Sequence, residues 1–207
     1  MYGHARLATV PAKRAITTHC MSHPPFRPRG TGITLIELLV VIAIAAILAG
    51  IAVPSFNDTI RRNRIDTAAN TFLNALNYAR TEAIRRNTYI ALRKSGSQWE
   101  NGYVAFVDSN ANGTIDTGEE TIRTWQGLPT GYTLRSNITN FSNTVRYNAR
   151  GEVDNNAVGG YFIVCHNNQL QGARAVILTR MRPVLAADTN GNGIPESDSA
   201  DISSCAT

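Results

Sequence analysis

A run of oxygen-bearing side chains, DSNANGTIDTGEE at residues 108–120, has the spacing of a calcium-binding loop. Calcium needs several oxygen ligands that converge from a sharp turn, and Gly113 permits such a turn. Every position of the pattern D-x-[DN]-x-[DN]-G-x5-E is matched, which predicts a calcium site. The flanking segments are expected to be strands, however, and the same residue types also build hairpin loops without metal. The predicted ligands are Asp108, Asn110, Asn112, Thr114 through its carbonyl, Asp116 and Glu119.

A second run, DTNGNGIPESDSAD at residues 188–201, begins in the same way. Its opening is formed by Asp188, Asn190, Asn192 and Gly193. The twelfth position is Ser199, so the pattern fails where a carboxylate is required. Asp198 or Asp201 could replace it, which makes this loop a weaker calcium candidate than the first.

The cysteines and histidines argue against an enzyme and for a disulfide. His166 is the one histidine beyond residue 32, and it is adjacent to Cys165. Neighbouring residues of a strand point to opposite faces, so a Cys-His catalytic dyad is disfavoured. Cys165 and Cys205 are the two cysteines that follow residue 32, and they lack the spacing of a zinc or redox site. An even count favours a disulfide in an oxidising compartment, and two free thiols are the alternative.

The positive charge of the chain lies in its first 32 residues. The formal net charge is +5, and this segment holds five Lys or Arg and no acid. The remaining 15 Lys and Arg balance the 15 Asp and Glu, so the rest of the chain is formally neutral. A basic leader followed by an apolar run is typical of a targeting segment more than of a DNA-binding protein.

The apolar run from Ile33 to Val53 has one charged residue, Glu37. As a helix it would be about 31 Å long, which is enough to span a bilayer. A cleaved secretory signal with a site near Ala49 and Ala52 is the alternative, but the run is long for one and an acid within it is costly. A cut between Gly32 and Ile33 would place Glu37 in the first turns of a helix, where a negative charge is favoured.

The segment GITLIELLVVIAIAAILAGIAVPSF resembles the class III signal of type IV pilins and type II secretion pseudopilins. The resemblance implies that prepilin peptidase cleaves after Gly32 and that the new first residue, Ile33, is N-methylated. It also implies that Glu37 pairs with the terminal amine of a neighbouring subunit during assembly. Ile33 stands where the family usually has Phe. Met21 offers an alternative start that gives a compact basic leader.

The chain after residue 54 changes from helical to strand periodicity. Apolar residues recur at helical spacing from Phe56 to Ala83, which predicts an amphipathic continuation of the helix with Arg residues on its solvated face. Pro54 would kink this helix without necessarily ending it. The predicted strands are TYIALR, GYVAFVD, ETIRTW, GYTLRS, TVRYNA, GYFIVCH and ARAVILTR, which are separated by turn formers.

The predicted fold class is α+β, with a long N-terminal helix followed by an antiparallel, β-rich globular head. The predicted parts are a leader over 1–32, a transmembrane and assembly helix over 33–54, its amphipathic continuation over 55–87, and a periplasmic head over 88–207.

The head extends the resemblance. The segments ALNYARTEAIRRNTYIAL, WENGYVAFVD, VRYNARGEV and GYFIVC are similar to the GspH/FimT family of minor pilins and pseudopilins. In some members a Gly-Arg-x-Arg turn binds DNA during natural transformation. Arg180 and Arg182 match its arginines, while Thr179 stands in place of the Gly. Two arginines on one face of an extended segment could hold phosphates.

The resemblance implies a non-enzymatic minor pilin in the bacterial inner membrane, which crosses it once and joins a pilus or pseudopilus. The implied partners are other pilins, prepilin peptidase and the membrane, with DNA and calcium as further candidate ligands. A pseudopilin of the GspH type and a DNA-binding minor pilin are the alternatives.

Overall fold

The structure is a computed structural model that describes residues 32–154 and 160–205. Apart from Gly32, the predicted leader lies outside the described residues. One long helix, α1 (Leu35–Arg86), continues through position 54. It ends because Asn87 adopts a left-handed conformation with φ 52°, and the N–H of Thr88 donates to the carbonyl of Ala83. The predicted long helix is therefore confirmed.

Each of the seven predicted strands is present, and three short ones were not predicted. The strands are β1 (Ile90–Lys94), β2 (Gly102–Val107), β3 (Thr121–Gln126), β4 (Tyr132–Ser136), β5 (Thr144–Tyr147), β6 (Gly160–His166), β7 (Gln169–Leu178), β8 (Pro183–Leu185), β9 (Glu196–Ser197) and β10 (Ala200–Asp201). Two short 3-10 turns, η1 (Trp99–Asn101) and η2 (Thr139–Phe141), connect them.

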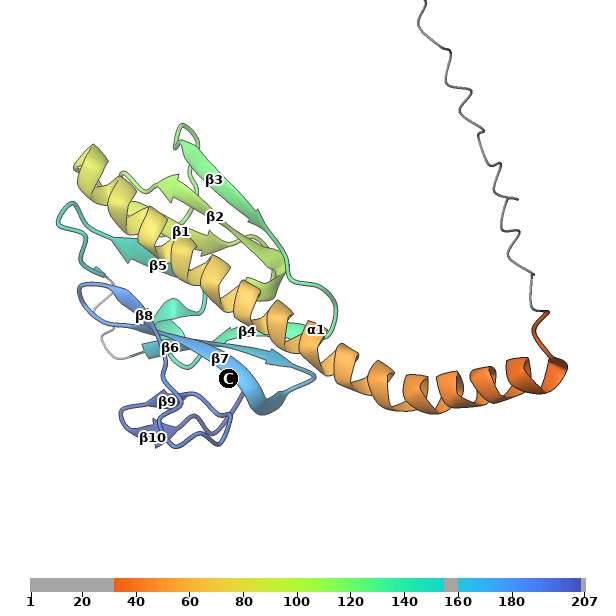
Figure 1. The fold of residues 1–207 in the computed structure, drawn as a ribbon. Coiled ribbons are helices and arrows are strands. Elements are labelled where there is room, and N and C mark those ends of the chain that lie inside the picture. Colours follow the sequence, from red (N-terminus) through yellow and green to blue (C-terminus); the bar gives the residue numbers. More distant parts are fainter. Residues whose placement is uncertain (1–31, 155–159, 206–207) are drawn as a thin grey trace, which may run out of the picture. The chain divides into compact units, whose positions relative to one another are not determined.

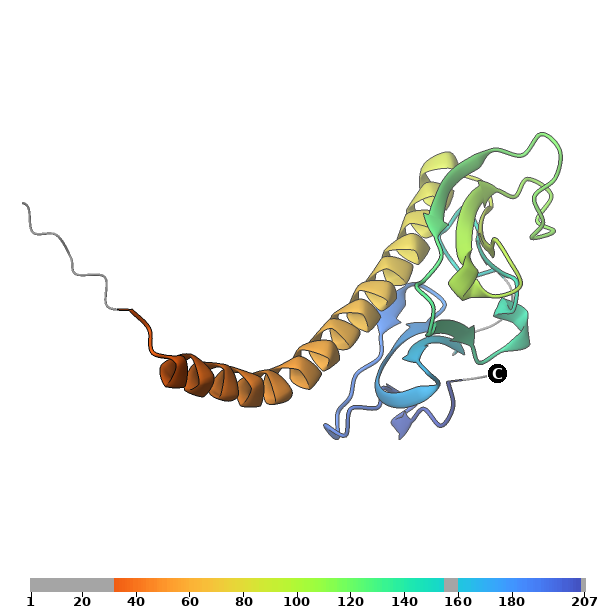
Figure 2. The same cartoon turned by 90° about the vertical axis from the view of Figure 1, so that its right-hand side faces the viewer.

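The strands form two antiparallel four-stranded sheets and a small hairpin. The first sheet has the order β3-β2-β1-β5 and the second has the order β4-β6-β7-β8. Strands β9 and β10 pair with each other, with Ala200 opposite Ser197 and Asp201 opposite Glu196. Figures 1 and 2 show the C-terminal half of α1 lying against both sheets.

One face of the C-terminal half of α1 supplies the centre of the core. Burial begins at Ile65, whereas Phe56 and Ile60, which the helical pattern includes, are exposed. Phe72 is fully buried, and its ring centroid lies 5.6 Å from Trp99, 5.2 Å from Tyr103 and 4.6 Å from Phe162. Burial of one Phe side chain contributes about 1.5–3 kcal/mol. This aromatic cluster therefore joins the helix to both sheets.

Candidate functional site

The start of α1 gives Glu37 a partner within its own chain. The backbone N–H of Glu37 donates to the hydroxyl oxygen of Thr34 over 3.2 Å, and the N–H of Thr34 donates to the Glu37 carboxylate over 3.5 Å. This reciprocal arrangement is a capping box, which satisfies two N–H groups that a helix start leaves unpaired. Glu37 thus sits in the first turn of the helix, where the helix dipole favours a negative charge.

The helix surface that follows Glu37 is apolar and exposed. Large hydrophobic side chains are accessible from Ile33, which is 74% exposed, to Phe56, which is 67% exposed. Within the described residues, α1 alone is long and apolar enough to cross a membrane, and its apolar stretch is unburied. A secretory signal meets the same criteria of length and composition. This surface would need a membrane or other helices to cover it.

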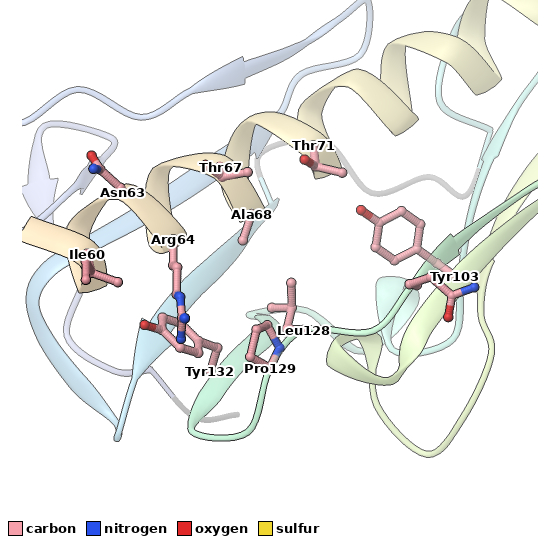
Figure 3. Close-up of a pocket in the computed structure, with 11 residues that line it drawn as sticks. Ile60, Asn63, Arg64, Thr67, Ala68, Thr71, Tyr103, Leu128, Pro129 and Tyr132 are labelled. Carbon is pink, nitrogen blue, oxygen red and sulfur yellow. The ribbon is translucent and has the colours of Figure 1, made fainter. Parts of the chain in front are cut away.

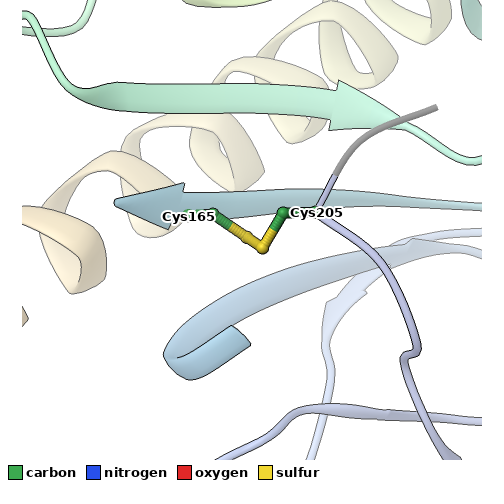
Figure 4. Close-up of a disulfide and its surroundings, with 2 residues drawn as sticks. All are labelled: Cys165 and Cys205. Atoms are coloured by element: carbon green, nitrogen blue, oxygen red, sulfur yellow. A yellow bond between two sulfur atoms is a disulfide. The ribbon is translucent and has the colours of Figure 1, made fainter. Parts of the chain in front are cut away.

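Cys165 and Cys205 form the predicted disulfide, as Figure 4 shows. Both residues are buried in a small cluster with Ile163 and Ile202, separate from the main core. The bond ties the C-terminal segment to β6. It also leaves the sulfur of Cys165 unavailable for catalysis, and the ring of His166 instead packs 4.7 Å from that of Tyr132.

The first polar loop brings its predicted metal ligands together, but they bond to one another. Asp116 Oδ2 accepts from the side-chain amides of Asn110 and Asn112, both over 2.7 Å, and these bonds lower the pKa of Asp116. Glu119 accepts from the N–H groups of Ser109 and Asp116. The hydroxyl of Thr114 donates to Asn112 Oδ1 over 2.7 Å.

Asp108, the first residue of this loop, is fully buried and already compensated. Its two oxygens accept from the N–H groups of Asn112 and Gly113, and a guanidinium nitrogen of Arg146 lies 3.6 Å away. Burial raises the pKa of Asp108, while the Gly113 N–H and the charge of Arg146 act in the opposite direction. Arg146 supplies only part of the positive charge that the carboxylate needs, because its guanidinium also pairs with Asp154 over 2.6 Å.

Over residues 32–154 and 160–205, no group of three or more His, Cys, Asp or Glu side chains is close enough to hold a metal ion. Calcium also binds through amide and carbonyl oxygens, which these four side-chain types do not provide. Calcium at the first loop stays a prediction.

Arg180 and Arg182 lie in a tight turn between β7 and β8, and not along an extended segment as predicted. The N–H of Thr179 donates to the carbonyl of Arg182, and the N–H of Arg182 donates to the Thr179 hydroxyl oxygen. The hydroxyl of Thr179 closes the turn further, at 2.7 Å from the Arg182 carbonyl oxygen. Both arginines and Met181 between them are exposed. They border a surface hollow together with Arg80, which sequence reasoning did not connect to them.

An apolar cleft of about 400 Å³ lies between α1 and the segment that joins β3 to β4 (Figure 3). Ile60 and Ala68 line it from the helix, and Leu128, Pro129 and Tyr132 line it from the other side. The sequence did not reveal this cleft, because its two walls are about 60 residues apart in the chain and neither has a motif.

Two family models match the chain. The model described as type II transport protein GspH matches residues 68–181, and the prokaryotic N-terminal methylation motif matches residues 27–53. The second match covers Gly32, Ile33 and Glu37, and it separates this helix from an ordinary secretory signal.

The chain is also similar to a curated protein and to a solved structure. The chain is 42% identical over 89 residues to the pilin-like protein PilA1 of Thermus thermophilus. The aligned residues cover 43% of this chain and 55% of PilA1. The fold is similar to that of the type IV minor pilin FimU of Pseudomonas aeruginosa. One crystal form gives a TM-score of 0.55 at 22% identity over 70% of this chain and 97% of FimU. A second crystal form gives 0.50 at 20% identity, over 68% of this chain and 98% of FimU.

Proposed function

The chain belongs to the GspH family, and on that premise we propose that it is a minor type IV pilin that assembles through α1 into a pilus or pilus-like filament. The family and the fold are those of pilins, which are structural proteins and not enzymes. The proposed partners are other pilins, which would contact the apolar surface of α1, and prepilin peptidase, which would cleave after Gly32.

The observation that carries this proposal is the exposed apolar surface from Ile33 to Phe56, with a carboxylate at its first turn. Such a surface is unstable in water and suits a bilayer before assembly and a bundle of helices afterwards. The basic leader favours a cytoplasmic start, which would place the head in the periplasm. We therefore propose a single-pass inner-membrane precursor.

The mature protein is expected to begin at Ile33, with a methylated amine. The reason is the methylation motif over residues 27–53 and the capped helix start at Thr34. Mass spectrometry of the N-terminal peptide, on protein purified from membranes, would measure this. A mature terminus near Gly50 would contradict the proposal, because the helix would then be a discarded signal.

A type II secretion pseudopilin is the nearest alternative, since it uses the same leader and helix. The genes adjacent to this one would distinguish the two roles.

Natural transformation is a second candidate role, favoured by the exposed turn that holds Arg180 and Arg182. Across the described ranges, no acid lies within 4.0 Å of either guanidinium. Arg80 adds a third positive charge beside the turn, although its Nε donates to the carbonyl of Gly151. Guanidinium groups at an exposed turn can bind phosphates without reading sequence.

The double variant Arg180→Ala/Arg182→Ala is expected to bind duplex DNA more weakly than the wild type. For each phosphate that the variant no longer neutralises, the slope of log affinity against log salt should fall by about 0.9, so the expected reduction is about 1.8. Gel shifts of the full chain in non-ionic detergent, over a series of salt concentrations, would measure both quantities.

The matched control is Arg62→Ala/Arg64→Ala, which removes the same charge from exposed positions on α1. Equal losses of DNA affinity in the two double variants would show nonspecific attraction to positive charge. If the wild type gave no gel shift at low salt, the DNA-binding role would be rejected and only the structural role would stand.

A further inference from the structure

The two polar loops have the same hydrogen-bonded framework, although only the first satisfies the calcium pattern. In each loop the N–H of the glycine donates to the leading aspartate, over 2.9 Å from Gly113 to Asp108 and 2.8 Å from Gly193 to Asp188. In each, the side-chain amides of both asparagines point to a single carboxylate. The second loop therefore shares the framework of the loop that satisfies the calcium pattern.

In the second loop Asp201 provides that carboxylate, from the hairpin strand β10. Its Oδ1 lies 3.0 Å from the amide nitrogen of Asn190 and its Oδ2 lies 2.6 Å from that of Asn192. The pairing of β9 with β10 positions Asp201 against the loop, two places beyond the Ser199 at which the pattern fails. The hairpin thus restores the missing acid from outside the pattern.

Glu196 holds the first turn of this loop. Its carboxylate accepts from the N–H groups of Thr189 and Asn190, both over 3.2 Å, and from the Thr189 hydroxyl. Two of these donors are backbone N–H groups, which cannot rotate away, whereas the donors to Asp201 are side-chain amides, which can. We therefore treat Glu196 as a positioning residue and not as a metal ligand.

The loops differ at the leading aspartate. Asp108 has both oxygens bonded and Arg146 beside it, as described above. In Asp188 the Oδ2 atom accepts from Gly193, but the Oδ1 atom is buried and has no hydrogen-bond partner among the described residues. No Lys or Arg nitrogen in the described ranges lies within 4.0 Å of Asp188, Glu196 or Asp201. Asp188 as a whole is half-buried, but a buried carboxylate oxygen without a partner is costly, and a bound cation would compensate it.

We propose that the second loop binds one calcium ion, held by Asp188 Oδ1, the side-chain oxygens of Asn190 and Asn192, the carbonyl of Ile194 and the carboxylate of Asp201. Each asparagine oxygen accepts one N–H bond in the loop and has a second lone pair for the metal. The two carboxylates balance the charge of the ion. Calcium is the appropriate cation because it accepts many oxygen ligands in a flexible arrangement, whereas magnesium requires a near-ideal octahedron.

Arg61 is the competing partner for Asp188. Both residues line a polar cavity of about 350 Å³, which Arg62 and Arg174 also line. The Nε atom of Arg61 is buried without a hydrogen-bond partner among the described residues. If the arginine moved to pair with Asp188, the loop would have no need of a metal. The experiment must therefore detect the ion itself.

Equilibrium dialysis of the full chain in detergent, stripped with chelator and exposed to radioactive calcium, would count the ions bound. Asp201→Asn is expected to weaken binding at the second loop about tenfold or more, because ligand charge sets calcium affinity. Asp188→Asn should weaken it likewise without altering the hairpin. The matched control is Asp198→Asn, an exposed acid of the same loop, for which a change of less than about twofold is expected.

Asp116→Asn distinguishes binding at the first loop from binding at the second. It removes a central acid of the first loop and should leave the ion of the second in place. The proposal would be overturned by absence of binding at millimolar calcium, by equal losses in Asp198→Asn and Asp201→Asn, or by loss of all binding in Asp116→Asn. Thermal melts of each variant in chelator would verify the fold. Calcium should raise the melting temperature of the wild type but not that of Asp201→Asn.

Discussion

Replacement of Glu37 by Gln is expected to leave cleavage and membrane insertion intact and to prevent entry into the filament. Gln can replace Glu in a capping box, so the helix start survives. The variant loses only the charge, which we propose pairs with the terminal amine of a neighbouring subunit. In an apolar bundle an unpaired ammonium group is costly, so incorporation should fall to a small fraction of the wild-type level. Immunoblots of sheared filaments against whole membranes would measure that fraction.

The control is Thr34→Ala, which removes the hydroxyl that accepts from the Glu37 N–H but retains the carboxylate. Loss of a cap costs the helix about 1 kcal/mol, which a membrane-embedded helix can tolerate. Thr34→Ala should therefore assemble. If Glu37→Gln assembled normally and Thr34→Ala did not, the acid would serve as a helix cap and the intersubunit role would be wrong.

Removal of the disulfide has the second large expected effect. The bond joins residues 40 positions apart, and the chain-entropy model assigns about 4 kcal/mol to a closed loop of that length. The double variant Cys165→Ala/Cys205→Ala should lose about that much free energy of unfolding. Since both side chains are buried, some packing is lost as well. Equilibrium denaturation of the mature protein would measure the difference.

Denaturation in the presence of a reductant supplies the control. Dithiothreitol should destabilise the wild type and leave the double variant unchanged. Two thiols that react with an alkylating agent in native protein purified without reductant would contradict the disulfide.

The periodic parts of the chain were predictable from the sequence, and the parts that depend on distant contacts were not. Apolar spacing identified α1 and the strands from β1 to β7, because these elements bury regular faces. Strands β8 to β10 have two or three residues each, too few for a period to be visible. The burial of Phe72 followed from the helical pattern, whereas the exposure of Phe56 did not, since the pattern does not indicate where the head begins to cover the helix.

The polar loops show the same limit in the candidate sites. The sequence ranked the first loop above the second because a pattern counts only residues within its own span. It could not show that Arg146, 38 positions after Asp108, lies 3.6 Å from that buried carboxylate. Nor could it show which acid lies against both asparagines of the second, because that contact depends on the pairing of β9 with β10. The sequence shows that Arg180 and Arg182 are two positions apart, but it did not predict the turn that exposes them.

The bond between Cys165 and Cys205 also determines how the head responds to proteases. The segment that it encloses contains the exposed turn at Met181 and the second polar loop, which are accessible places for a protease to cut. A single cut in either place produces two fragments that stay covalently joined, and the strands on each side of the cut stay paired in their sheets. A nicked subunit would therefore keep its C-terminal segment and migrate as two pieces only after reduction.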